Sequence, residues 1–323
     1  MILKNLSLVD VVVGRFPPPI GGVSVFVERK YESLRASGAR RVDLGSRLWL
    51  IKLVHLAAFT RCRFLLNTTN LAVLLVFYCL RILGRARIYD HNSSRHYWGA
   101  GFKEKCYIFF VRRAGSVCVV HEHLLVQYSR RGIDVPMEVE SPFLPPVEAR
   151  FSDVYDGYPV DAKTFLNEAG YFRIGLSASK YTIDAQGRDL YGIETLCDLV
   201  ARLREAGVEA KCLLAVAEWR DHLIPDVLKN KIIRLVDSGH LVLLAGQYEF
   251  WPIYRYLDCF LRLTSTDGDS VSVREALHYQ CPVVASDVVP RPDGTIIYQY
   301  AEVESIFYRV LSLASLRRGI RDA

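Results

Sequence analysis

Stretches that favour buried strands alternate with stretches that favour helices along nearly all of the 323 residues. In the first half, β-branched residues are frequent in 8–14 and 116–121, and in the second half apolar residues fill 172–178, 211–217 and 259–263. Most intervals between these runs have helical character. Two parallel strands need a crossover connection, usually a helix, so the alternation predicts an α/β protein built on parallel sheets.

The alternation is interrupted once, which predicts two domains. Prolines cluster at positions 136, 142, 145, 146 and 159, and polar residues and glycines continue to residue 170. We expect two tandem Rossmann-like doubly wound domains facing a cleft, because such folds bind ligands at the carboxyl edges of their sheets. The expected boundaries are 1–150 for the first domain, 151–170 for a linker, 171–300 for the second domain, and 301–323 for a C-terminal helix that could cross back to the first domain.

The composition narrows the class of protein. Apolar residues make up 51% and charged residues 24%, which is typical of a folded globular chain. The eight cysteines lie in apolar runs with no Cys-x-x-Cys pair, which favours reduced, mostly buried thiols in the cytosol and no metal site. The first seven residues lead into a strand without a signal-peptide pattern. The longest apolar runs are shorter than the roughly 18 residues that a membrane-spanning helix needs.

Basic residues concentrate in the first half. Residues 1–150 contain 22 Lys and Arg against 11 Asp and Glu, a net charge of +11, and the remaining 19 against 24 give −5, which together make the overall +6. The first half is therefore expected to meet an anionic partner, and since no nucleic-acid motif is present we favour anionic lipid. A solvated basic surface is the alternative. The segment 98–113 interleaves aromatic and basic residues, which fits either a membrane surface or a helix packed into the core.

The most informative motif lies between a predicted strand at 259–263 and a second strand at 282–286. Asp267 and Glu275 are eight positions apart, the first on the strand-to-helix loop and the second within the helix. Small residues between them expose backbone N–H groups at a helix N-terminus, which binds anions. Carboxylates beside an anion site fit a ligand that carries hydroxyls as well as phosphate, as a nucleotide sugar does. An Asp-Gly turn followed by an ordinary helix is the alternative.

These residues resemble the signature of the retaining nucleotide-sugar glycosyltransferases of family 4, which have the GT-B fold. The resemblance rests on the spacing of Asp267 and Glu275 with 281–286 after it, on the loop 19–23, and on the order of strands and helices over nearly the whole chain. It implies transfer of a sugar from a nucleotide-sugar donor to a saccharide or polyprenyl-linked acceptor in surface polysaccharide synthesis, with retention. It departs from the pattern at Asp267, where the family has Glu, and at Tyr191, where the family has a lysine.

The resemblance also implies roles for individual residues. Glu275 would bind the ribose hydroxyls of the donor, Asp267 the hydroxyls of the transferred sugar, and His91 would lie against that sugar. The N–H groups of the loop and first helical turn would face the diphosphate, and two glycines would let the backbone of the first domain approach the donor. The family usually holds the diphosphate with an arginine after the first strand of the second domain and with a later lysine; here Lys180 and Arg188 would supply that charge. The loop residues are Gly268, Asp269, Ser270, Val271 and Ser272, and the two glycines are Gly21 and Gly22.

Structural readings of the same residues stay open. Glu275 could be an ordinary helix-surface residue, Asp267 a turn residue, and His91 a loop histidine bonded to Asp90; His121 and His123 are expected to be structural. No histidine lies in the loop that contains Gly21 and Gly22, where inverting enzymes of the resembled fold often keep a catalytic base, so the resemblance favours retention. In a retaining reaction the leaving phosphate itself can take the acceptor proton.

At the level of the whole protein, we expect an enzyme that needs no metal or other cofactor, in the cytoplasm or peripheral on the inner face of the cell membrane. A catalytically inactive subunit that binds a nucleotide sugar for a partner enzyme is the main alternative, and a sugar-nucleotide epimerase a weaker one.

Overall fold

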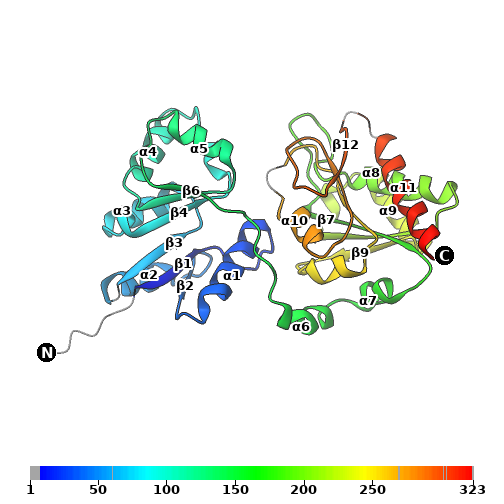
Figure 1. Cartoon of the computed structure of the whole chain (residues 1–323), viewed down its shortest axis with the longest axis horizontal. Helices are drawn as coiled ribbons and strands as arrows, with labels where there is room; N and C mark the ends of the chain where they lie inside the picture. The colour runs from blue at the N-terminus through cyan, green and yellow to red at the C-terminus, as the bar shows by residue number, and fades with distance from the viewer. Residues whose placement is uncertain (1–7, 60, 268–269, 301, 303, 322–323) are drawn as a thin grey trace. The chain divides into compact units, whose positions relative to one another are not determined.

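The chain folds into two units, each built on its own six-stranded parallel sheet (Figure 1). The computed structural model describes residues 8–59, 61–267, 270–300, 302 and 304–321. Unit 1 comprises residues 1–144 and unit 2 residues 145–323. The predicted fold class, α/β with two tandem doubly wound units, is confirmed.

In unit 1 the strand order is β2-β1-β3-β4-β5-β6. The strands are β1 (Val9–Gly14), β2 (Arg40–Asp43), β3 (Cys62–Leu66), β4 (Ala86–Asp90), β5 (Ser116–Val119) and β6 (Met137–Val139). The helices are α1 (Gly22–Arg35), α2 (Trp49–Phe59), α3 (Leu71–Cys79), α4 (Phe102–Val111) and α5 (Glu122–Ser129), with short 3₁₀ turns η1 (Leu83–Arg85) and η2 (Ser93–His96).

Alternating side chains of these strands build two cores. Val11 and Val13 of β1 face the layer formed by α2, α3, α4 and α5, whereas Val12 faces α1. The period of two follows from the pleat of the strand, so a β-branched run supplies both faces of the sheet. Of the five helices described in unit 1, four therefore cover one face and α1 covers the other (Figure 1).

In unit 2 the strand order is β12-β11-β10-β7-β8-β9. The strands are β7 (Phe172–Lys180), β8 (Ala210–Glu218), β9 (Leu241–Ala245), β10 (Cys259–Arg262), β11 (Val283–Ser286) and β12 (Ile296–Tyr298). The helices are α6 (Phe151–Asp156), α7 (Val160–Asn167), α8 (Ile193–Glu205), α9 (Asp226–Asp237), α10 (Val271–His278) and α11 (Glu304–Arg321), with 3₁₀ turns η3 (Glu148–Arg150), η4 (Asp221–Leu223) and η5 (Trp251–Tyr256).

Two layers also cover the second sheet. Helices α8, α9 and α11 pack on one face, and α7, η5 and α10 pack on the other. Residues 151–170, expected as a linker, instead form α6 and α7, and Ala162, Phe165 and Leu166 are buried in the core of unit 2. The apolar side chains of this stretch hold it to the sheet despite its one proline and two glycines.

The last helix, α11, which was expected to be able to cross back to the first domain, packs against α8 and β12 of unit 2. Its Ile306, Val310 and Ala314 lie in the core of that unit, and Arg202 of α8 forms an ion pair with Glu304. Six of the eight cysteines are buried and all eight are free thiols. No helix among the described residues is long and apolar enough to span a bilayer.

Candidate functional site

The sheet of unit 2 reverses its strand order between β7 and β10. From β7 the chain builds outward through β8 and β9 on one side, and β10, β11 and β12 lie on the other side. The loops that follow β7 and β10 therefore diverge at the carboxyl edge, which is where open α/β sheets bind ligands. The loop after β7, residues 181–192, contains Arg188 and Tyr191, and the loop after β10 contains Asp267.

Asp267 lies in the loop after β10, held between two arginines. Arg262 donates two hydrogen bonds to its carboxylate, at 2.8 and 2.9 Å, and Arg291 donates a third at 2.7 Å. The hydroxyl of Thr264 adds a fourth at 3.2 Å. Burial alone would raise the pKa of Asp267, but the two guanidinium groups outweigh it and lower the pKa to about 2. The aspartate is thus ionised and its acceptor positions are largely used within the protein.

The two arginines were missed by the sequence interpretation. Arg291 has a side chain only 2% exposed, and it also donates to the backbone oxygen of Ser286 at 2.9 Å and to the Ser286 hydroxyl at 3.0 Å. Arg262 ends β10 and lies over the ring of Tyr191, 5.7 Å from its centroid. A usable signal existed at Arg262, because a cation within an apolar strand must find a partner. Nothing local marked Arg291, 24 residues from Asp267.

Helix α10 follows this loop and carries the second acid. Glu275 is 7% exposed and lies on the buried side of α10, not on the helix surface. Burial raises the pKa of Tyr158, and the negative charges of Glu249 and Glu275 raise it further. Ser270 is the N-cap residue, and its hydroxyl lies 2.9 Å from that of Ser272. Gly268 and Asp269 lie outside the described residues, so the predicted N–H groups at α10 are described only for Ser270, Val271 and Ser272.

The loop after β7 uses its charges internally. The Arg188 guanidinium donates to the Asp184 carboxylate at 2.8 Å and lies over the ring of Tyr300. Backbone hydrogen bonds and this arginine lower the pKa of Asp184 even though its desolvation would raise it. Arg188 is therefore committed to its own loop. Lys180 is the last residue of β7, and its side chain is exposed.

The N-terminus of α8 already holds a carboxylate. Asp189 accepts hydrogen bonds from the backbone N–H groups of Glu194 at 3.0 Å and Tyr191 at 3.1 Å. Burial raises the pKa of Asp189 while these N–H groups oppose the rise. At Gly192 the backbone has φ +72°, and a Cβ would lie 2.5 Å from that of Leu263, so only glycine fits. The N-terminus of α8 is thus occupied by a side chain of the protein itself.

In unit 1 the corresponding reversal lies between β1 and β3, and His91 follows the neighbouring strand β4. Its Nε2 lies 3.2 Å from Oδ1 of Asn67, and its ring packs edge-on against Phe26, 4.8 Å between centroids. Burial lowers the pKa of His91 to about 4, with the charge of Asp90 opposing the shift, so the imidazole is neutral at pH 7. The hydrogen bonds described for the Asp90 carboxylate are not with His91. This carboxylate accepts hydrogen bonds from the Ser94 N–H and from the Tyr128 hydroxyl.

Gly21 and Gly22 begin helix α1. Gly21 is extended, with φ −165°, and a Cβ there would meet only the Ser24 hydroxyl at 4.0 Å, so neither strain nor space requires glycine. The Ser24 hydroxyl accepts the Gly21 N–H at 3.0 Å. A close approach does limit the space at Gly14, at the end of β1, where a Cβ would lie 2.9 Å from Val27.

Two predicted structural histidines lie at the start of α5. The His121 imidazole accepts the backbone N–H of His123, 3.4 Å away, as the cap of that helix. Among the described residues, no group of three histidine, cysteine, aspartate or glutamate side chains is placed to hold a metal ion.

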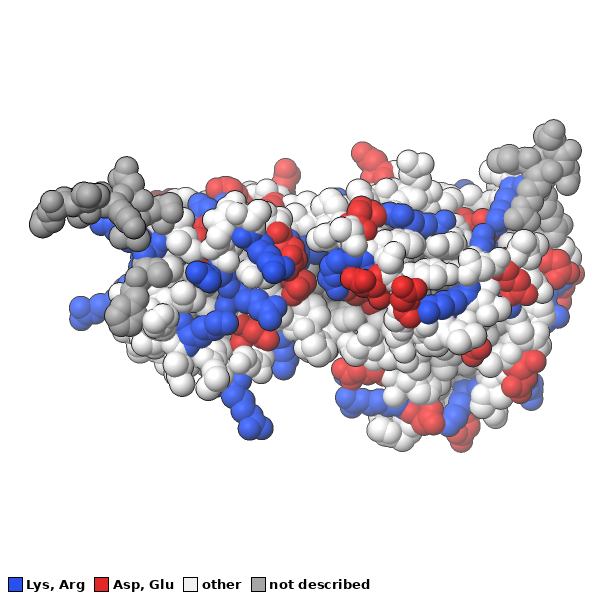
Figure 2. Space-filling model, turned by 90° about the horizontal axis from the view of Figure 1, so that it is seen from below, with Lys and Arg blue, Asp and Glu red and all other residues white. Residues whose placement is uncertain are grey.

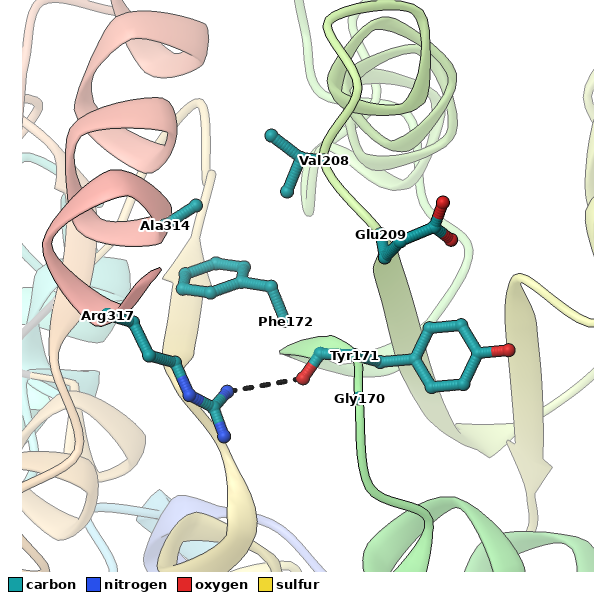
Figure 3. A pocket seen from close by; sticks show the side chains of 7 residues that line it. All are labelled: Gly170, Tyr171, Phe172, Val208, Glu209, Ala314 and Arg317. Atoms are coloured by element: carbon teal, nitrogen blue, oxygen red, sulfur yellow. Dashed lines mark hydrogen bonds between the residues drawn. The ribbon is translucent and has the colours of Figure 1, made fainter. Parts of the chain in front are cut away.

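A small pocket in unit 2 lies at the opposite edge of the sheet, where β7 and β8 begin (Figure 3). Arg317 of α11 donates to the backbone oxygen of Tyr171 at 3.2 Å and pairs with Asp258. The pocket is lined by Gly170, Tyr171, Phe172, Val208, Glu209, Ala314 and Arg317. Its place at the amino edge separates it from the residues described above.

Comparison with known proteins identifies relatives by structure alone. No protein-family model matches the sequence, and no curated protein matches it. Anabaena HepE, solved in complex with UDP and glucose, is 13% identical, with a TM-score of 0.60 over 94% of this chain and 89% of that one. Trehalose-6-phosphate synthase OtsA is 13% identical, with a TM-score of 0.63 over 95% and 91%. The sucrose-phosphate synthase of Thermosynechococcus elongatus is 16% identical, with a TM-score of 0.61 over 95% and 90%. At these identities the likeness shows the fold, which is that of GT-B glycosyltransferases.

Proposed function

We propose that this protein transfers a sugar from a nucleotide-sugar donor to a saccharide or lipid-linked acceptor. The observation that carries the proposal is the carboxyl edge of the second sheet, where the N-terminus of α10, the buried Glu275 and two arginines lie at the reversal of strand order. Anabaena HepE, which has the same fold, was solved in complex with UDP and glucose and, separately, with UDP-glucose.

The phosphates of the donor would meet the N-terminus of α10. Helix N–H groups and the helix dipole favour an anion there, and they become more favourable as charge grows on the leaving diphosphate. Arg262 and Arg291 carry two positive charges against the single carboxylate of Asp267 in their described hydrogen bonds. Asp267 then acts as a positioning residue that fixes the loop, and it does not contact the sugar. Lys180, the last residue of β7, is exposed and is a candidate phosphate ligand.

Glu275 would accept the ribose hydroxyls of the donor. An ionised carboxylate accepts two such bonds, and charge-assisted hydrogen bonds are worth about 1.5–3 kcal/mol. For His91 of unit 1 the proposal keeps the role that the resemblance implies, contact with the transferred sugar, as a neutral hydrogen-bond partner and not as a cation. Membership of family 4, retention of configuration and a role in surface polysaccharide synthesis are parts of this proposal that rest on the sequence resemblance. Metal independence is a further part, which rests on the lack of a metal-ligand spacing in the sequence.

A second candidate function is a glycosyltransferase-like subunit that binds a nucleotide sugar for a partner enzyme. Three features of the loop after β7 favour it. Tyr191 replaces the expected lysine, Arg188 is bonded to Asp184, and Asp189 occupies the N-terminus of α8. The donor would then lack cations that an active transferase uses at its diphosphate.

Calorimetry with UDP, GDP and the corresponding sugar nucleotides, followed by a donor-turnover assay, separates these functions. Glu275→Gln should weaken nucleotide binding by about tenfold to a hundredfold, as expected for a charge-assisted bond. The matched control is Glu205→Gln, at an exposed position at the end of α8. Binding with turnover supports the transferase, and binding without turnover supports the subunit. Full binding by Glu275→Gln would contradict the role given to this residue, and conversion of the donor alone to an isomer would indicate an epimerase.

A further inference from the structure

One long segment of unit 1 contains no acidic residue. Between Asp43 and Asp90 the sequence has seven basic residues and no Asp or Glu; the basic residues are 47, 52, 61, 63, 81, 85 and 87. Arg63 is paired with Asp10, and Arg87 with Glu138 and Glu140. For the other five basic residues, the described part of the chain shows no ion pair with an Asp or Glu. The segment holds α2 and α3, which lie in the same helix layer of the sheet (Figure 1).

Helix α2 is apolar on its outer side as well as on its inner side. Leu53 is fully buried against the sheet, yet Ile51 is 68% exposed, Leu50 43% and Val54 42%, and Leu48 just before the helix is 64% exposed. Lys52 and His55 are the other exposed side chains of the helix before residue 58. A helix that is hydrophobic all round is normally covered on both sides, so a partner is expected to cover this one.

The apolar surface continues along the neighbouring helices. Leu75 and Tyr78 of α3 are 48% and 42% exposed, and the Tyr78 ring contacts that of Phe109 on α4, 5.3 Å between centroids. The guanidinium of Arg113 lies 3.7 Å from the centroid of Phe109. Arg85 donates to the backbone oxygen of Ala57 at 3.3 Å and so ties the segment after α3 to the end of α2. Helices α2, α3 and α4 thus present one outer surface.

This surface modifies the expectation for residues 98–113, which the sequence left open between membrane and core. In the structure, some aromatic side chains of this segment are buried in the core and others are exposed. Tyr107 and Phe110 are buried, whereas Phe102 and Phe109 are exposed beside exposed basic residues. The exposed half adjoins α3, so the segment contributes the margin of the surface and α2 its apolar centre.

The charge of the surface selects the kind of partner. A second copy of this chain in a two-fold dimer would place the same cations against one another, which is unfavourable without acids to pair them. A bilayer with anionic lipids offers headgroups for Arg47, Lys52 and Arg81 and an apolar boundary for the side chains between them. Figure 2 shows Lys and Arg side chains on one face of unit 1, with Asp and Glu side chains beside some of them.

We propose that the outer face of α2, continued by α3 and the exposed half of α4, docks unit 1 on an anionic lipid surface. The inference rests on the proposed function only in giving the transferase a membrane-bound acceptor. Binding to lipid itself requires neither a donor nor turnover, so the two proposals can fail separately.

The test is co-sedimentation of the full-length protein with phosphatidylcholine vesicles, with and without phosphatidylglycerol. We expect binding only when the anionic lipid is present, and weaker binding as salt is raised. Ile51→Glu with Val54→Glu should lower the partition coefficient at least about tenfold, since each change adds a charge and removes apolar contact. The matched control is Val227→Glu with Val236→Glu, which alters two exposed valines of α9 in unit 2.

A second variant guards against misfolding of the first. Arg47→Ser with Lys52→Ser removes charge at exposed positions without adding any, and it should weaken binding to anionic vesicles while nucleotide binding stays unchanged. If the wild-type protein does not co-sediment with anionic vesicles, the proposal is overturned. Equal binding by the wild type and both variants would also overturn it. A dimer that dissociates in the variant Ile51→Glu with Val54→Glu would overturn it as well. Loss of nucleotide binding in every variant and in the wild type would refute the sugar-transfer proposal and leave lipid docking intact.

Discussion

The ion cluster at Asp267 gives the sharpest test of the structure, through the variant Asp267→Asn. The amide keeps the size of the side chain but removes the charge that is shared by two arginines, whose side chains are 15% and 2% exposed. Breaking a buried ion pair by neutralising one partner costs about 3–5 kcal/mol, because the remaining charge stays buried without compensation. We therefore expect unit 2 to lose about that much stability at pH 7.

The pH dependence provides an independent magnitude. The pKa of Asp267 falls from 3.8 to about 2 on folding. A carboxyl with a lowered folded pKa contributes stability that is fully present above pH 3.8 and is lost as the pH falls through 2. The difference corresponds to about 2 kcal/mol, since one pKa unit is worth about 1.36 kcal/mol. Asp267→Asn should lack this part of the acid destabilisation.

Hydrogen exchange measured by mass spectrometry reports on the cluster locally, in peptides that cover 259–267 and 283–291. Protection in both peptides should fall together in Asp267→Asn, because Arg291 joins the two loops. The control Asp237→Asn, at an exposed position ending α9, should change stability by less than about 0.5 kcal/mol. The proposed role of the ion pairs at Asp267 would be refuted if Asp267→Asn lost less than about 1 kcal/mol of stability. It would also be refuted if the stability of the variant fell with decreasing pH in parallel with that of the wild type.

Three further predictions concern single residues. Gly192→Ala should destabilise unit 2 by more than about 2 kcal/mol in thermal unfolding, and Gly187→Ala, which has a positive φ but open space, by about 1 kcal/mol; equal losses would contradict the close contact. His91 should titrate near pH 4 in an NMR experiment, and its neutral burial should cost stability as the pH falls from 6.5 towards 4; a pKa near 6.5 would show an open histidine. Arg188→Ala should change nucleotide affinity by less than about twofold, because its guanidinium serves Asp184; a tenfold loss would restore it as a phosphate ligand.

The sequence by itself determined the architecture. Runs such as 9–14 and 259–262 carry the period and the apolar content of buried strands, and these are local properties that need no knowledge of the fold. The same holds for the interval between Asp267 and Glu275, which placed a loop and a helix N-terminus after a strand. Residues 151–170 were misassigned because prolines and glycines mark turns locally, whereas the burial of Phe165 and Leu166 depends on a sheet formed much later in the chain.

The tertiary structure alone decided what the polar residues do. Arg291 reaches Asp267 because β11 pairs with β10, and Asn67 reaches His91 because β3 pairs with β4. These contacts depend on strand order, which local periodicity does not encode. An apolar run likewise shows that α2 forms but not that Ile51 points away from the core, since a helix buries one side only when the layer beneath it is in place.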